Sequence, residues 1–162
     1  MNKFARLVIS LVALFCASAV SHAAATFTGN ATQKSGNYTE SYAQTYTLSG
    51  TTSAPTQIKI VSKYSGGSYT STETFVFAKK GKVTHSYLDP MTGKPSNSLT
   101  GTYTIKKTSA KTTVAVILKD SMGSSTYTYT DTFIFTVKAL KATFVSKFGS
   151  LTNTTTFSGK QK

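Results

Sequence analysis

Strict alternation of aromatic or apolar residues with threonine is the clearest pattern in the chain, and residues 126–137 show it best. One set of alternate positions holds Tyr127, Tyr129, Asp131, Phe133, Phe135 and Val137. The other set holds Thr126, Thr128, Thr130, Thr132, Ile134 and Thr136. Because successive side chains of a β-strand point to opposite faces, this period of two predicts a strand with one core face and one solvent face.

Similar segments, rich in Thr, Tyr, Phe, Val and Ile, recur along the chain and predict an all-β fold. No segment shows sustained helical periodicity. Short connections with turn residues, such as Gly66-Gly67 and Asp89-Pro90, favour hairpins and antiparallel pairing. The predicted strands are residues 26–33, 42–48, 56–64, 69–78, 82–88, 99–106, 112–119, 125–137, 141–148 and 153–158.

Two halves of the chain resemble each other at an offset of about 57 residues. The segment from Glu73 to Phe77 aligns with the segment from Asp131 to Phe135, and Tyr46-Thr47-Leu48 aligns with Tyr103-Thr104-Ile105. Agreement across several strands predicts an internal duplication, with repeat halves at about 42–98 and 99–158. Each half would be a four-strand meander.

These elements predict an antiparallel up-and-down meander of about eight to ten strands, because a sheet of that size tends to close or to split into two layers. A closed barrel that resembles the soluble lipocalin/calycin shape is the first prediction, and a two-layer β-sandwich is the alternative. The resemblance is one of architecture only, because the chain has no Trp and lacks that family's G-x-W signature. An outer-membrane barrel fits poorly, because polar residues such as Lys59 and Lys63 would face lipid.

The N-terminus has the features of a secretory signal peptide over residues 1–23. Lys3 and Arg6 precede an apolar run that ends near Val20, and small residues follow, so that cleavage after Ala23 or Ala25 is expected. The apolar run is shorter than the roughly 20 residues of a membrane-spanning helix. The remaining residues, 26–162, are predicted to form a single exported β-domain, secreted or periplasmic, with no transmembrane segment.

Cleavage would also change the composition. The formal charge would fall from +13 to +11, the single Cys would be lost, and every remaining basic residue apart from His85 would be Lys. Because Arg is the usual residue for bidentate contacts to bases and phosphates, nucleic acid is not an expected partner. A surface of lysines instead suits diffuse attraction to an anionic polysaccharide or to lipid head groups.

Alternate turns of a meander lie at the same end of the sheet, which predicts a cluster of lysines at one end. We call this cluster the lysine rim. Exposed turn lysines that serve only solubility are the competing interpretation. The lysine rim consists of Lys79, Lys80, Lys82, Lys106, Lys107, Lys111, Lys138 and Lys141.

The exported part offers few groups for catalysis or metal binding, namely five carboxylates and His85. A zinc site needs three or four ligands, and acid–base catalysis needs such groups held together. There is no G-x-S-x-G motif or phosphate-binding glycine loop. We therefore expect no enzyme activity, no cofactor and no metal.

Glu73 and Asp131 occupy equivalent repeat positions, and each shares a strand face with two phenylalanines. If that face points inward, it predicts a cavity for a small apolar ligand with a few polar groups. The favoured alternative places both acids near wet strand ends, paired with Lys, and makes His85 a half-buried strand residue. The candidate ligand site comprises Glu73, Phe75, Phe77, Tyr127, Tyr129, Asp131, Phe133 and Phe135.

Two classes of function follow. The first is a non-catalytic binding module that holds a small apolar ligand, or that docks on an anionic surface through the lysine rim. The second is a structural protein of the envelope or matrix that has no small-molecule ligand. An interior cavity would favour the first class, and an exposed sheet edge would favour the second.

Overall fold

The computed structural model describes residues 24–64, 69–90, 92–96, 98–122 and 125–162. The predicted signal peptide, residues 1–23, lies outside this part. Strand β1 begins at Ala25, so that cleavage after Ala23 would leave the whole strand in the exported chain. No helix among the described residues is long and apolar enough to cross a membrane.

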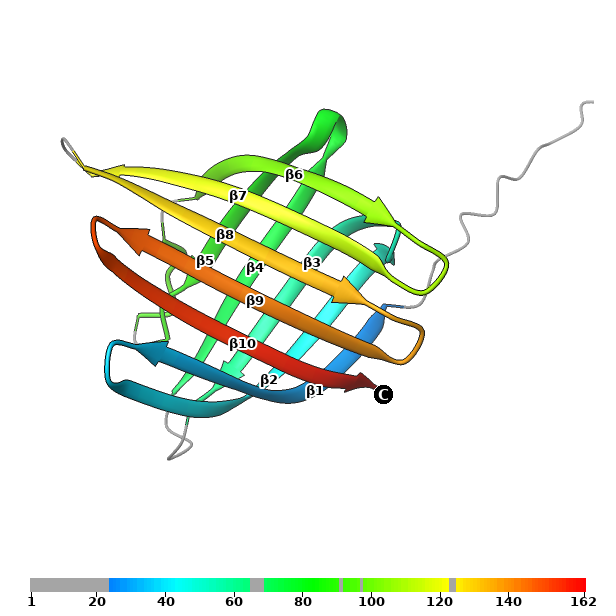
Figure 1. Cartoon of the computed structure of the whole chain (residues 1–162), viewed down its shortest axis with the longest axis horizontal. Coiled ribbons are helices and arrows are strands. Elements are labelled where there is room, and N and C mark those ends of the chain that lie inside the picture. The colour runs from blue at the N-terminus through cyan, green and yellow to red at the C-terminus, as the bar shows by residue number, and fades with distance from the viewer. Residues whose placement is uncertain (1–23, 65–68, 91, 97, 123–124) are drawn as a thin grey trace, which may run out of the picture.

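The described residues form a closed, antiparallel barrel of ten strands (Figure 1). Each strand pairs with its neighbours in sequence, and β1 pairs with β10 to close the sheet. The prediction of an all-β meander barrel is therefore confirmed, and the two-layer sandwich was wrong because the sheet has no break. The strands are β1 (Ala25–Ser35), β2 (Tyr38–Thr51), β3 (Ala54–Lys63), β4 (Thr70–Ala78), β5 (Lys82–Leu88), β6 (Leu99–Lys107), β7 (Thr112–Met122), β8 (Ser125–Phe135), β9 (Ala139–Phe148) and β10 (Leu151–Gln161).

Each predicted strand overlaps one observed strand, and the differences lie at the ends. Strand β2 begins at Tyr38, four residues before the predicted range, because the polar segment that follows the Gly36 turn pairs with the end of β1. Polar pairs of this kind contribute hydrogen bonds but no apolar alternation, so that the pattern could not detect them. A 3-10 turn at Lys79–Gly81 joins β4 to β5.

Inward-facing side chains form an aromatic and aliphatic core in one half of the barrel. The rings of Tyr46 and Phe157 lie 4.2 Å apart, and those of Phe75 and Phe133 lie 5.4 Å apart. Leu48, Ile58, Val114 and Leu140 surround the rings and are each at most 2 % exposed. Alternation along every strand thus separates a packed interior from an exterior rich in Thr, Ser and Lys.

Two glycines stand opposite each other where β1 and β10 close the barrel. Gly29 pairs with Gly159, and a Cβ on Gly29 would lie 2.1 Å from the backbone oxygen of Ser158. No real Cβ fits at that distance, so that this close approach of the two strands requires glycine. Closure of the barrel therefore depends on residues that provide no side chain to the core.

The two ends of the barrel differ in the segments that they hold (Figure 1). The β2–β3, β4–β5, β6–β7 and β8–β9 turns lie at one end with the C-terminal end of β10, and we call this the basic end. The β1–β2, β3–β4, β5–β6, β7–β8 and β9–β10 connections lie at the other end, which we call the open end. The duplication stays a prediction; its halves, 42–98 and 99–158, would cover most of β2 with β3–β5, and β6–β9 with most of β10, and leave β1 outside them.

Candidate functional site: a pocket at the open end of the barrel

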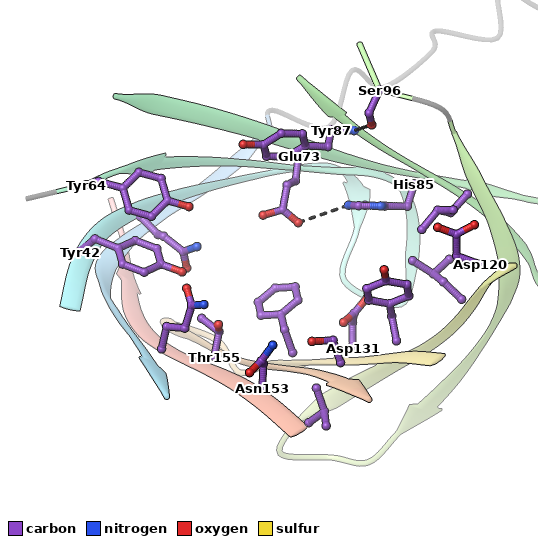
Figure 2. Close-up of a pocket in the computed structure, with 18 residues that line it drawn as sticks. Tyr42, Tyr64, Glu73, His85, Tyr87, Ser96, Asp120, Asp131, Asn153 and Thr155 are labelled. Carbon is purple, nitrogen blue, oxygen red and sulfur yellow. Dashed lines mark hydrogen bonds and ion pairs between the residues drawn. The ribbon is translucent and has the colours of Figure 1, made fainter. Parts of the chain in front are cut away.

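A pocket of about 690 Å³ occupies the open half of the barrel interior (Figure 2). The same alternate positions that hold core residues deeper in the barrel hold polar residues and tyrosines here. Three carboxylates, of Glu73, Asp120 and Asp131, line it. The other polar and aromatic lining residues include Tyr42, Tyr64, Tyr87, Tyr129, Phe144, His85, Gln33, Gln44, Ser96, Asn153 and Thr155.

A buried hydrogen-bond chain fixes one side of the pocket. The Tyr46 hydroxyl donates to Oε1 of Gln44 at 2.9 Å, and Nε2 of Gln44 donates to the Ser62 hydroxyl at 2.9 Å. Gln44 is 4 % exposed, so that these bonds replace the water that its amide loses on burial. The chain joins β2 to β3 and holds the amide rigidly at the boundary between core and pocket.

Glu73 and His85 form a hydrogen bond in the pocket, which is an ion pair when the imidazole is protonated. Glu73 is on β4 and His85 is on β5, and Oε2 of the carboxylate lies 3.2 Å from Nε2 of the imidazole. The imidazole ring also packs on Phe75, with ring centroids 4.5 Å apart. The carboxylate therefore points inward and is paired with His85, which corrects the favoured prediction that the two acids lie at wet strand ends beside Lys.

Asp131 lies on β8 and points into the same pocket (Figure 2). Its side chain is 4 % exposed, and burial raises the pKa of its carboxyl group to about 7. Nearby His85 opposes this increase in pKa, and the carboxylate of Glu73 adds to it. Asp131 is thus a carboxyl group that can gain or lose its proton near neutral pH.

Tyrosines make up much of the remaining wall. The rings of Tyr42 and Tyr64 lie 4.6 Å apart, and burial raises the pKa of the Tyr42 hydroxyl to about 12, so that this hydroxyl stays protonated at neutral pH. Tyr129 and Phe144 contribute rings from β8 and β9. The wall therefore offers aromatic faces together with hydroxyl groups that can donate or accept hydrogen bonds.

The structure divides the eight residues of the predicted ligand site into two groups. Glu73, Tyr129 and Asp131 line the pocket. Tyr127 lies further out, where its ring stacks on Phe148 with centroids 4.3 Å apart. The four phenylalanines lie nearer the basic end and are packed in the core: Phe75, Phe77, Phe133 and Phe135, which are at most 8 % exposed.

Most of the pocket was not found from the sequence. His85, Tyr42, Tyr64 and Asp120 were missing from the predicted ligand site, although all four line the pocket: Tyr42, His85 and Asp120 from β2, β5 and β7, and Tyr64 directly after β3 at the open end. The assignment of turns to the two ends, combined with the inward alternation, contained this signal. Among the described residues, no group of three or more His, Cys, Asp or Glu side chains could hold a metal ion.

All eight members of the lysine rim are exposed and lie at or next to turns of the basic end. Lys160 and Lys162 also lie there, because β10 ends beside the β8–β9 turn, where the Gln161 amide donates to the backbone oxygen of Lys138 at 2.9 Å. Lys107 and Lys111 line a hollow of about 450 Å³ at this end. The sequence did not predict Lys160 and Lys162 at the basic end, because their position depends on where β10 lies in the closed barrel.

Comparisons with known proteins add little to this geometry. No protein-family model matches the chain, and no curated protein matches its sequence. One solved structure, of a protein from Bacteroides fragilis NCTC 9343 described as a candidate outer membrane protein, matches at 9 % identity with a TM-score of 0.19. The match covers 85 % of this chain and 97 % of that one. At this TM-score the similarity supports no inference about function.

Proposed function

We propose that this chain is an exported, non-catalytic β-barrel that binds a small molecule in the pocket at its open end. The single observation that supports this most is the pocket itself. Its volume of about 690 Å³ falls within the ~300–1,000 Å³ that is usual for ligand sites. A barrel that served only as a structural unit would have no need to leave half of its interior unfilled.

The polar exterior supports a location in water, and the predicted signal peptide supports one outside the cytoplasm, in the periplasm or the medium. The outward side of β8 holds four threonines and one isoleucine, and all described lysines are exposed. Closure of the sheet between β1 and β10 gives every described strand two paired neighbours, although only four residue pairs join β5 to β6. Assembly by edge-to-edge pairing, which the structural alternative would use, therefore has no complete edge strand as a template.

Two neighbouring threonines of β10 provide a matched test of pocket binding. Thr155 lines the pocket, and Thr156 is exposed on the outer wall. We expect Thr155→Trp to occupy pocket volume and to weaken the binding of small molecules at least tenfold, while Thr156→Trp leaves binding unchanged. Ligand-observed NMR with a panel of neutral, cationic and anionic aromatic fragments measures the affinities. If no fragment of any charge loses affinity in Thr155→Trp, this function is wrong.

A second function is favoured by the basic end, which we propose docks on an anionic polysaccharide or on lipid head groups. The lysine rim, Lys160 and Lys162 gather there, whereas none of the five carboxylates of the chain lies in a turn of the basic end: Glu40 and Asp89 lie at or near connections of the open end, and Glu73, Asp120 and Asp131 line the pocket. A surface of one charge sign attracts polyanions in a salt-dependent manner. Retention on heparin, an anionic polysaccharide, measures this binding. Because the two functions use opposite ends of the barrel, a single molecule can perform both.

A further inference from the structure

The charge of the pocket is opposite to that of the rest of the molecule. The chain has a formal net charge of +13, and all its described lysines are exposed. The pocket lining contains three carboxylates and His85, with no lysine among the described lining residues. The inward-facing carboxylates therefore make the pocket negative, while the exposed lysines make the outer surface positive. Solubility does not explain this difference in charge between the pocket and the surface.

Asp131 has no hydrogen-bond partner among the described residues of this interior. It is 4 % exposed and lines the pocket, and no hydrogen bond or ion pair joins its carboxylate to another described residue. His85, which could have paired with it, is bonded to Glu73 instead. A ligand that fills the pocket would remove the solvent that remains at this carboxylate, and a carboxylate buried without a partner is costly, so that a ligand with a positive charge or a hydrogen-bond donor would be favoured there.

Aromatic rings surround the same space (Figure 2). Tyr42 and Tyr64 line one side of it, Tyr87 lies beside Glu73, and Tyr129 is on the same strand as Asp131. The negative faces of aromatic rings attract cations, and such rings commonly surround ammonium groups in binding sites. Carboxylates and aromatic faces therefore favour the same kind of ligand.

We propose that the pocket binds an organic cation, a protonated or quaternary amine on an apolar body, whose ammonium group is placed at Asp131 near the Glu73–His85 pair. This rests on the proposed ligand-binding function and specifies its ligand class. An anion would meet three carboxylates, and a wholly apolar ligand would leave Asp131 buried without a partner. A metal ion is disfavoured, because the carboxylates and His85 do not form a group that could hold one among the described residues.

Binding of a cation should depend on pH, because it favours the ionised form of Asp131. The pKa of this group, about 7 in the empty pocket, implies that roughly a tenth of Asp131 is ionised at pH 6 and nine tenths at pH 8. Affinity should therefore rise about tenfold between these values. The groups that interact electrostatically with Asp131 are Glu73 on β4, His85 on β5, Tyr46 on β2 and Tyr129 on its own strand. The other titratable groups that line the same pocket are Tyr42 on β2, Tyr64 after β3, Tyr87 on β5 and Asp120 on β7, and β9 contributes only uncharged side chains to the described lining.

Three probes of one shape and different charge provide the test: 2-phenylethylamine, 2-phenylethanol and phenylacetate. Isothermal titration calorimetry at pH 8 should give an affinity for the amine at least tenfold higher than for the alcohol or the acid. The amine, whose own charge stays constant as a Lys-like ammonium over this range, should bind about tenfold more weakly at pH 6. Thr155→Trp should abolish the binding, and Thr156→Trp should not.

Asp131→Asn should weaken amine binding at least tenfold at pH 8 and remove most of the pH dependence, while binding of the alcohol is unchanged. Glu40→Gln is the matched control, because Glu40 does not line the pocket. If Asp131→Asn fails to fold, as judged by circular dichroism, the charge series and the pH dependence of the unmodified protein decide the question.

The outcomes separate this inference from the function on which it rests. Equal or tighter binding of the alcohol or the acid at the Thr155 site would overturn the cation preference and leave the ligand-binding function standing. An amine affinity that does not change in folded Asp131→Asn would overturn the role of Asp131. Absence of binding by all three probes would overturn the inference as well, and the wider fragment panel would then decide the function separately.

Discussion

Individual carboxylates in this protein differ in their surroundings more than in their sequence context. Glu73 and Asp131 are each followed at the second and fourth positions by phenylalanine, and both point into the pocket. Glu73 is paired with His85, whereas Asp131 is more deeply buried and has no hydrogen bond among the described residues. The difference arises because His85 lies on β5, next to β4, while the strands that flank β8 offer no basic side chain on their inward face.

Burial of Asp131 predicts a loss of stability as pH rises. Its pKa is about 7 in the folded state against a usual 3.8, so that between these values the folded state binds more protons than the unfolded state. The free energy of unfolding should therefore fall from about pH 4 to pH 7, by up to about 4 kcal/mol from this group, and level off above. Urea unfolding across this range measures the slope.

Asp131→Asn should flatten this slope, because the asparagine does not titrate. Glu40→Gln should keep this slope, because the Glu40 carboxylate is less buried than that of Asp131. It accepts a hydrogen bond from the Tyr38 hydroxyl at 3.2 Å. If the free energy of unfolding changes with pH in the same way in the unmodified protein and in Asp131→Asn, the burial of Asp131 does not control the pH dependence of stability.

At the scale of elements, the strand that closes the barrel depends on a close approach of two backbones. Gly29 of β1 and Gly159 of β10 face each other at an inward position. A side chain there would have to displace the backbone of the opposite strand, which a packed interior resists. These glycines are therefore requirements of barrel closure, although in the sequence they resemble any other glycine in a strand.

Gly29→Ala should destabilise the protein by about 1–3 kcal/mol, because its Cβ would overlap the Ser158 carbonyl. Asn30→Ala, at the neighbouring exposed position, should change stability by at most about 0.5 kcal/mol. Urea unfolding followed by circular dichroism compares the two variants. Equal stabilities would mean that β1 and β10 can separate locally at no cost.

At the scale of the whole molecule, the barrel has a packed half and an open half. Rings of Phe27, Phe133 and Phe135 lie in the packed half, and the three inward carboxylates lie in the open half. Ten lysines gather at the packed end, namely the lysine rim with Lys160 and Lys162. The packed core and the candidate binding site thus lie in different halves of the barrel, and the two proposed binding functions use opposite ends.

Two sets of six Lys→Gln substitutions test the basic end with the same change in net charge. The first set is taken from the lysine rim and should elute from heparin at clearly lower salt than the second set, because only the first reduces the local charge at one end. Elution of both sets at the same salt concentration would show that only net charge matters. The first set is Lys79, Lys80, Lys107, Lys111, Lys138 and Lys141; the second is Lys34, Lys59, Lys63, Lys94, Lys119 and Lys147.

The sequence by itself determined the strands, the meander and the turns, because alternation and turn chemistry are local properties that each segment expresses separately. It also determined that Glu73 and Asp131 share a strand face with phenylalanines. The tertiary structure decided that this face points inward, that Glu73 pairs with His85, and that the pocket replaces the core at the open end. These features depend on closure and on how far each inward residue lies along the barrel axis. Both are relations between strands distant in sequence, which no local pattern records.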